Sequence, residues 1–123
     1  MVQKRVLVIE DEPNISDAIR FILTRNGWQV EVEAGGTAAL ARLRADPPDA
    51  LILDLMLPDM DGFEVLRHLR AAAHTRDLPV LMLTAKGQSA DRDLAARLGV
   101  TCFMTKPFAN SEVVAALQDI IGP

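Results

Sequence analysis

Short apolar runs alternate with longer segments of mixed polarity along the whole chain. In the longer segments, apolar residues recur every three or four positions, which is the spacing of a helix with one buried face. The central runs are apolar on consecutive residues, a pattern typical of parallel strands that helices cover on both faces. The five runs are Val6–Ile9, Val30–Val32, Ala50–Leu53, Val80–Leu83 and Cys102–Met104. The pattern therefore predicts five strand-helix units.

The residues at the expected helix boundaries agree with this division. Pro13 suits the first turn of a helix that Asn26-Gly27 would end, and Asp61 followed by Glu64 resembles a capping pair. With right-handed crossovers, five such units give an α/β fold with a doubly wound, five-stranded parallel sheet. The common strand order for that number is the flavodoxin-like order 2-1-3-4-5, which has a ligand crevice between strands one and three.

Polar residues end four of the apolar runs. Glu10-Asp11 follows the first run, Asp54 the third and Thr84 the fourth, while Lys106 comes shortly after the fifth. Because the carboxyl ends of parallel strands lie at one edge of a sheet, we expect these side chains to gather beside the crevice. Each residue alone is commonly a cap or a surface charge, so the hypothesis depends on their combination.

The three carboxylates of this group predict a metal site. Carboxylates within roughly 4–6 Å of one another repel by a few kcal/mol per pair unless a cation lies among them. Oxygen ligands favour a hard ion, and Mg²⁺ fits because it binds one or two carboxylates, keeps several waters and bridges to phosphoryl oxygens. We expect Asp11 and Asp54 to be direct ligands, Glu10 to act through a water, and the backbone carbonyl of Met56 to complete the shell.

Asp54 is also placed to act as a nucleophile. A carboxylate can attack phosphorus and form an acyl phosphate. The cation and the Lys106 ammonium would offset the charge of the transferred group, which is most of what this reaction requires. The Thr84 hydroxyl and Lys106 are then the expected donors to the new phosphoryl oxygens.

Composition narrows the class of protein. A chain of 123 residues that is 50% hydrophobic can close one core, so we expect a single domain over residues 1–123. A net charge of −4 without a dense basic cluster argues against direct binding of nucleic acid. Cys102 is the only cysteine, which excludes an internal disulfide. The first apolar run is too short for a signal peptide or a membrane span, so we expect a cytoplasmic location without membrane association.

Four segments around the candidate residues form recognisable motifs. They are Val6-Leu7-Val8-Ile9-Glu10-Asp11-Glu12, Leu53-Asp54-Leu55-Met56-Leu57-Pro58-Asp59-Met60-Asp61-Gly62, Leu83-Thr84-Ala85 and Phe103-Met104-Thr105-Lys106-Pro107-Phe108. Together they resemble the CheY-like receiver domain of bacterial two-component response regulators. The resemblance covers essentially the whole length of the chain.

The resemblance implies a signalling switch. The implied roles are phospho-acceptor for Asp54, Mg²⁺ binding for Glu10 and Asp11, switch hydroxyl for Thr84, phosphate binding for Lys106, switch aromatic for Phe103, and a cis peptide bond before Pro107. The implied phosphoryl donor is a histidine of a sensor histidine kinase or a histidine phosphotransfer protein. The domain would catalyse only its own phosphorylation and slow dephosphorylation. Its fourth helix, fifth strand and fifth helix would then control a downstream protein partner or effector domain.

The chain departs from the usual pattern of the family at several positions. The acidic pair is Glu10-Asp11 rather than the commoner Asp-Asp, and we expect a bridging water to absorb the extra methylene. Phe103 replaces a frequent tyrosine, so its inward state would depend on packing alone. In winged-helix regulators, acid–arginine pairs join two copies; only Arg92 and Glu112 are suited to such a pair here, and we expect a monomer or a weak dimer.

Two further positions bear on the lifetime of the phosphoryl group. Met56 and Lys86 come two residues after Asp54 and Thr84, where the family tunes the access of attacking water. We expect a bulky Met56 and a long Lys86 to shield the phosphoryl group and to slow its hydrolysis.

Two other classes of protein compete with this interpretation. A phosphatase of the haloacid-dehalogenase type also uses a strand-end aspartate with Mg²⁺, but it needs a second aspartate two positions on, where this chain has Met56. A flavin mononucleotide module needs a Ser/Thr/Gly-rich phosphate loop after the first strand, where Glu10-Asp11-Glu12-Pro13 would repel the phosphate. The residues name neither kinase nor target, and they leave open whether the domain acts alone or within a longer regulator.

Overall fold

A computed structural model describes residues 3–85 and 89–121 of the chain. The strands in these residues form a five-stranded sheet in the order β2-β1-β3-β4-β5, and every neighbouring pair is parallel. The strands are β1 (Arg5–Ile9), β2 (Gln29–Glu33), β3 (Ala50–Asp54), β4 (Val80–Thr84) and β5 (Cys102–Thr105). The predicted fold class and strand order are therefore confirmed.

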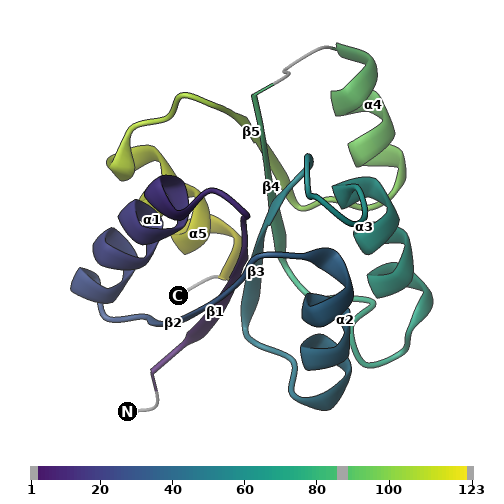
Figure 1. Cartoon of the computed structure of the whole chain (residues 1–123), viewed down its shortest axis with the longest axis horizontal. Coiled ribbons are helices and arrows are strands. Elements are labelled where there is room, and N and C mark those ends of the chain that lie inside the picture. The colour runs from purple at the N-terminus through teal and green to yellow at the C-terminus, as the bar shows by residue number, and fades with distance from the viewer. Residues whose placement is uncertain (1–2, 86–88, 122–123) are drawn as a thin grey trace.

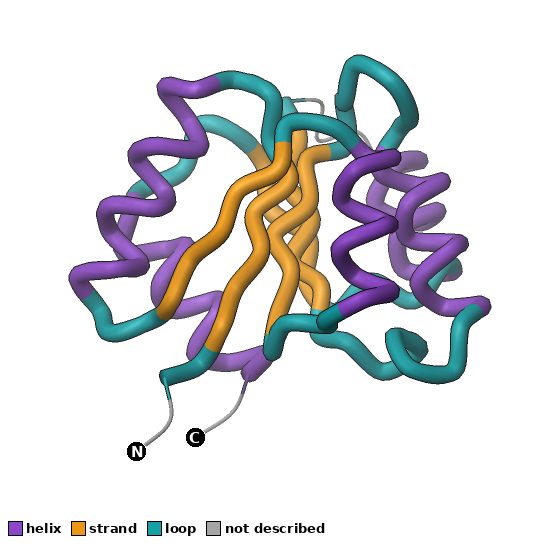
Figure 2. Tube along the Cα trace, turned by 60° about the horizontal axis from the view of Figure 1, so that its bottom comes forward, coloured by secondary structure: helices purple, strands orange, loops and turns teal. Residues whose placement is uncertain are grey.

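Helices cover both faces of this sheet, as Figures 1 and 2 show. They are α1 (Pro13–Arg25), α2 (Gly36–Ala45), α3 (Gly62–Ala71), α4 (Ser89–Arg97) and α5 (Asn110–Ile121). α1 and α5 lie on one face, and α2, α3 and α4 lie on the other. Within the part of the chain that the structure describes, no helix has both the length and the apolar character to cross a membrane.

The strands supply apolar side chains to both layers of helices. In β1, Leu7 and Ile9 belong to the core under α2 and α3, whereas Val6 and Val8 belong to the core under α1 and α5. Successive side chains of a strand point to opposite faces, so two covered faces require apolar residues at consecutive positions. This requirement is the physical reason for the uninterrupted apolar runs of the sequence.

The helices begin and end where their boundary residues predict. Pro13 is the first residue of α1, and the Asn26 N–H donates to the carbonyls of the last turn. Gly27 follows with φ of +92°, a left-handed conformation that glycine adopts without strain. At α3, the Asp61 side chain accepts a hydrogen bond from the Glu64 N–H at 2.9 Å. The predicted start and end of α1 and the predicted cap of α3 are therefore present in the structure.

Candidate functional site

The candidate residues meet at the carboxyl edge of the sheet. Asp54 is the last residue of β3 and Thr84 is the last residue of β4. Glu10 directly follows β1, and Lys106 directly follows β5. The parallel register of the four strands brings these ends side by side. The convergence expected from the strand order is thus present in the geometry.

Three carboxylates form a compact group at this edge. Glu10, Asp11 and Asp54 each offer one oxygen, and these oxygens all lie within 4.8 Å of one another. Glu10 and Asp54 are almost fully buried, with 2% and 4% of their surface exposed, whereas Asp11 is exposed. Asp11 is therefore the solvent-exposed member of the group.

The Lys106 ammonium connects the two buried carboxylates. Its Nζ lies 2.7 Å from Glu10 Oε1 and 3.4 Å from Asp54 Oδ1. Burial opposes the charge of this ammonium, but the hydrogen bond to Glu10 and the charge of Asp54 outweigh it and raise the pKa of Lys106. The lysine is therefore held as a cation within reach of Asp54, while its shorter contact is with Glu10.

One ammonium does not balance the charge of the group. The pKa of Asp54 is raised from 3.8 to about 7, first by burial and then by the neighbouring charge of Glu10, against the opposing effect of Lys106. A buried carboxylate that resists ionisation in this way is a position at which a second cation is favourable. The ligand atoms are all oxygens, which suit a hard ion such as Mg²⁺. The residues present therefore fit the expected magnesium ion.

The loop between β3 and α3 packs closely against Asp54. The Met56 N–H points at Asp54 Oδ1 over 3.4 Å, and the Met56 side chain is 54% exposed. At the end of this loop, a Cβ on Gly62 would lie only 2.7 Å from the Asp54 carbonyl oxygen and 2.9 Å from the Leu55 Cα. A glycine is therefore required where α3 begins, because any side chain would displace the backbone of the phospho-acceptor candidate.

Thr84 and Phe103 lie on the neighbouring strands. Thr84 is completely buried, and its carbonyl accepts a hydrogen bond from the Lys106 N–H at 2.8 Å. Phe103 is half-buried in β5 opposite Met82 and packs against the core under α2, α3 and α4. Thr84 therefore contacts the backbone of the Lys106 segment, whereas Phe103 belongs to the packing on the α2, α3 and α4 side of the sheet.

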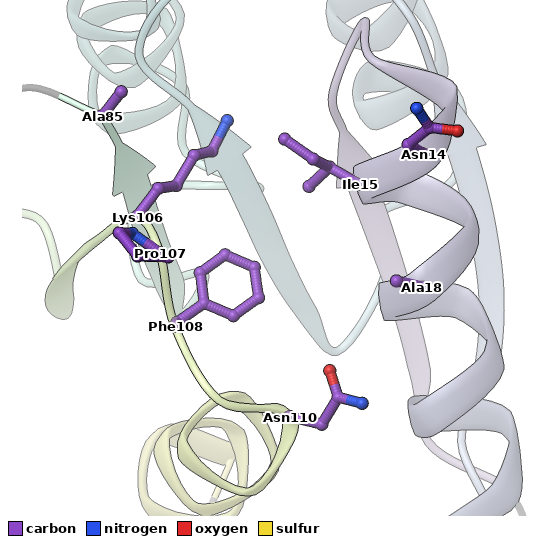
Figure 3. A pocket seen from close by; sticks show the side chains of 8 residues that line it. All are labelled: Asn14, Ile15, Ala18, Ala85, Lys106, Pro107, Phe108 and Asn110. Carbon is purple, nitrogen blue, oxygen red and sulfur yellow. The ribbon is translucent and has the colours of Figure 1, made fainter.

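A pocket of about 440 Å³ opens beside the acidic group. Figure 3 shows Lys106, Pro107 and Phe108 on one side of it and Ile15 and Ala18 of α1 on the other. The Lys106–Pro107 peptide bond is cis. Since most of its wall is apolar, the pocket adds a hydrophobic surface next to the charged group.

The two residues considered for pairing across a dimer both have partners within the chain. The Arg92 guanidinium lies over the Phe103 ring, 4.9 Å from its centroid. Glu112 Oε1 accepts a hydrogen bond from the Ala109 N–H at 2.8 Å, at the start of α5. Lys86, the other residue expected to shield the phosphoryl group, lies outside the described residues.

Sequence reasoning missed two functional contacts of the β3–α3 loop. The first is the close approach of Gly62 to Asp54, which the motif alone did not reveal. The second is Asp59, whose carboxylate accepts hydrogen bonds from the N–H groups of Gly36 and Thr37 at 2.9 and 3.0 Å. Gly35, the N-cap residue of α2, has no side chain with which to cap the helix, but glycine is common at this position and does not by itself indicate an outside cap.

The curated proteins that are similar in sequence to this chain include several transcriptional regulatory proteins. The phosphate regulon transcriptional regulatory protein PhoB of Escherichia coli K12 is 37% identical over 118 residues, which cover 96% of this chain and 52% of PhoB. The chain spans about half the length of this and other curated relatives that it matches.

Solved structures with a similar fold include response regulators and receiver domains. The chemotaxis response regulator CheY4 of Vibrio cholerae has a TM-score of 0.91 and 28% identity, covering 97% of this chain and 99% of CheY4. The receiver domain of the sensor histidine kinase PA1611 from Pseudomonas aeruginosa PAO1, which holds a magnesium ion coordinated in its active site cleft, has a TM-score of 0.90 and 30% identity. That alignment covers 99% of this chain and 100% of the other.

The family model described as the response regulator receiver domain matches residues 6–118. These residues include β2 to β5, all of β1 except Arg5, the acidic group and Lys106. On this match, the chain belongs to the response regulator receiver domain family.

Proposed function

We propose that Asp54 accepts a phosphoryl group from a phosphohistidine of a sensor histidine kinase or a histidine phosphotransfer protein. The proposal treats residues 1–123 as a single receiver domain. The observation that carries it is the buried Asp54 carboxylate lying 3.4 Å from the Lys106 ammonium, within one compact group of three carboxylates. Glu10 shares these features, and Asp54 is preferred as the acceptor because it lies in the segment 53–62 that resembles the phospho-acceptor motif of the family.

The transfer is a displacement at phosphorus. An ionised Asp54 oxygen attacks, the P–N bond to the donor histidine breaks, and the electron pair of that bond returns to the imidazole. Asp11, Asp54, the Met56 carbonyl and, through a water, Glu10 would hold a Mg²⁺, which would supply positive charge to the phosphoryl group. Lys106, which directly follows β5, adds a second positive charge. Hydrolysis of the acyl phosphate then resets the domain slowly.

Phosphorylation is expected to change the surface formed by α4, β5 and α5. Thr84 ends β4 beside Asp54, and its hydroxyl is the donor proposed for a phosphoryl oxygen. Movement of Thr84 changes the space beside β5, into which Phe103 turns. This local change in packing alters the surface formed by α4, β5 and α5. Switches of this kind convert a local event into a change that a partner can bind.

The partner that binds this surface is either a separate protein or an effector domain of a longer regulator. PhoB is named as a transcriptional regulatory protein, and this chain spans about half of it. An output through DNA would therefore reside in an effector domain, since the receiver itself carries a net charge of −4. A cytoplasmic setting is consistent with a kinase as donor.

The test is exposure of the purified protein to acetyl phosphate with Mg²⁺ or with EDTA, followed by intact-mass measurement. We expect a gain of one phosphoryl group with Mg²⁺, none with EDTA and none for Asp54→Asn. Asp17→Asn, a substitution at an exposed aspartate of α1, is the matched control and should be phosphorylated normally. Phosphorylation of Asp54→Asn at the wild-type rate would overturn the proposal.

A further inference from the structure

The helix α2 is capped by a residue from a distant loop. Its N-cap residue is Gly35, which has no side chain to accept the free N–H groups of the first turn. Asp59 of the β3–α3 loop caps the helix instead. Its Oδ1 accepts a hydrogen bond from the Gly36 N–H at 2.9 Å, and its Oδ2 accepts one from the Thr37 N–H at 3.0 Å. Both carboxylate oxygens are thus used to join the loop to the helix.

The glycines at the start of α2 make this approach possible. A Cβ on Gly35 would lie 3.1 Å from Asp59 Oδ1, and a Cβ on Gly36 would lie 3.2 Å from the Met60 sulfur. Hydrogen bonds from the backbone of Thr37 and then of Gly36 lower the pKa of Asp59 to about 2. The carboxylate is therefore ionised at neutral pH, as suits a group at the positive end of a helix.

The same loop begins at the candidate site. Its first residues follow Asp54 directly, and Met56 is the residue whose carbonyl is proposed as a metal ligand. At its base the Gly62 N–H donates to the Leu55 carbonyl at 2.8 Å. Asp59, in the middle of the loop, binds the first turn of α2. The loop is therefore held both at its base and at its middle.

We propose that Asp59 is a positioning residue for the metal site: by holding the β3–α3 loop on the first turn of α2, it fixes the segment that carries Met56 beside Asp54. This inference rests on the proposed function, because it assumes that Mg²⁺ binds at the carboxylate group. Loss of the tether removes no metal ligand, but it loosens the loop that carries the Met56 carbonyl. Residues that orient metal ligands from outside the metal's own shell typically change metal affinity about 10- to 100-fold when removed.

A simple helix cap would also explain the contact, and the two roles are separable. Asp59→Ala removes the cap and the tether together. Adding Gly35→Ser to it restores a local cap, because Gly35 has φ −138° and ψ 159°, the extended conformation of an N-cap residue. The three atoms nearest to a Cβ at position 35 belong to the Asp59 carboxylate, which Asp59→Ala removes. The double variant therefore has a capped α2 and a free loop.

The experiment is a Mg²⁺ titration of the unphosphorylated protein, followed by amide chemical shifts, together with thermal unfolding and amide hydrogen exchange at Met56. We expect Asp59→Ala to weaken Mg²⁺ binding about tenfold and to speed exchange at Met56. Gly35→Ser in the Asp59→Ala background should recover thermal stability but neither Mg²⁺ affinity nor protection of Met56. Asp46→Ala is the matched control, since it removes an exposed carboxylate, ion-paired with Arg5, from the other end of α2.

Two results would overturn the inference while leaving the proposed function intact. One is recovery of Mg²⁺ affinity in the double variant, which would make Asp59 a helix cap only. The other is normal Mg²⁺ affinity in Asp59→Ala. A wild-type protein that binds no Mg²⁺ would overturn the proposed function as well, so the two failures are distinguishable.

Discussion

The buried charge of Asp54 should make the metal-free protein less stable than a variant with a neutral side chain at this position. The pKa of Asp54 is raised from 3.8 to about 7 by burial first and by the charge of Glu10 second. At about 1.4 kcal/mol per pKa unit, the ionised form costs the folded protein on the order of 4 kcal/mol. Asp54→Asn removes the charge with little change in size, so it should raise the free energy of unfolding by up to about 4 kcal/mol near pH 8.

The size of this effect should depend on pH in a defined direction. Because the folded-state pKa of Asp54 is above the unfolded-state value, protonation stabilises the folded protein fully below 3.8. That stabilisation is lost as the pH rises and is gone above about 7. The difference between Asp54→Asn and wild type should therefore be small near pH 4, grow up to about pH 7 and then stay constant.

The assay is urea unfolding in EDTA, followed by the fluorescence of Trp28, which is the only tryptophan and is buried. Mg²⁺ should stabilise wild type more than Asp54→Asn and so narrow the difference between them. Asp17→Asn, at an exposed position, should show no such pH dependence. A less stable Asp54→Asn protein near pH 8, or a difference that is constant between pH 4 and pH 8, would refute the reasoning.

Three further substitutions test other parts of the site. Gly62→Ala places a Cβ 2.7 Å from the Asp54 carbonyl and should destabilise the protein by about 1–3 kcal/mol in urea unfolding; an unchanged midpoint would contradict the contact. Arg92→Gln removes a cation–π contact worth about 0.5–1 kcal/mol, so the ¹⁹F resonance of a fluorinated Phe103 should shift. Arg25→Gln is the control: it removes the similar contact with Phe21 and should leave the Phe103 resonance unchanged. Met56→Asn should admit water and shorten the phosphoryl half-life, and an unchanged half-life would argue against shielding by Met56.

The sequence predicts the sheet well because the physical requirement is local and repeated. A strand covered on both faces needs consecutive apolar residues, and β3 and β4 meet this requirement without interruption. The strand order then follows from right-handed crossovers, and the polar residue at each strand end follows from the order. The meeting of Glu10, Asp54 and Lys106 could be predicted for this reason.

The contacts that sequence reasoning missed depend on how segments pack together in three dimensions. The Asp59 cap joins residues 23 positions apart along the chain and depends on a glycine that provides no cap of its own. Lys106 was expected to bind phosphate, but its shortest contact here is with Glu10, which the longer glutamate side chain reaches at 2.7 Å. How far a side chain extends, and how closely a loop approaches a helix, depend on packing geometry. The pattern of polar and apolar positions does not specify that geometry.

Chemical trapping of the phosphorylated residue tests the central claim most directly. Borohydride reduces an acyl phosphate to an alcohol, so a phosphorylated aspartate becomes homoserine, which peptide mass spectrometry can place in the sequence. After treatment with acetyl phosphate and Mg²⁺, we predict homoserine at position 54, and none when EDTA replaces Mg²⁺. Homoserine at Asp11 or Asp59 with none at position 54, or the same yield at position 54 in EDTA, would contradict the account.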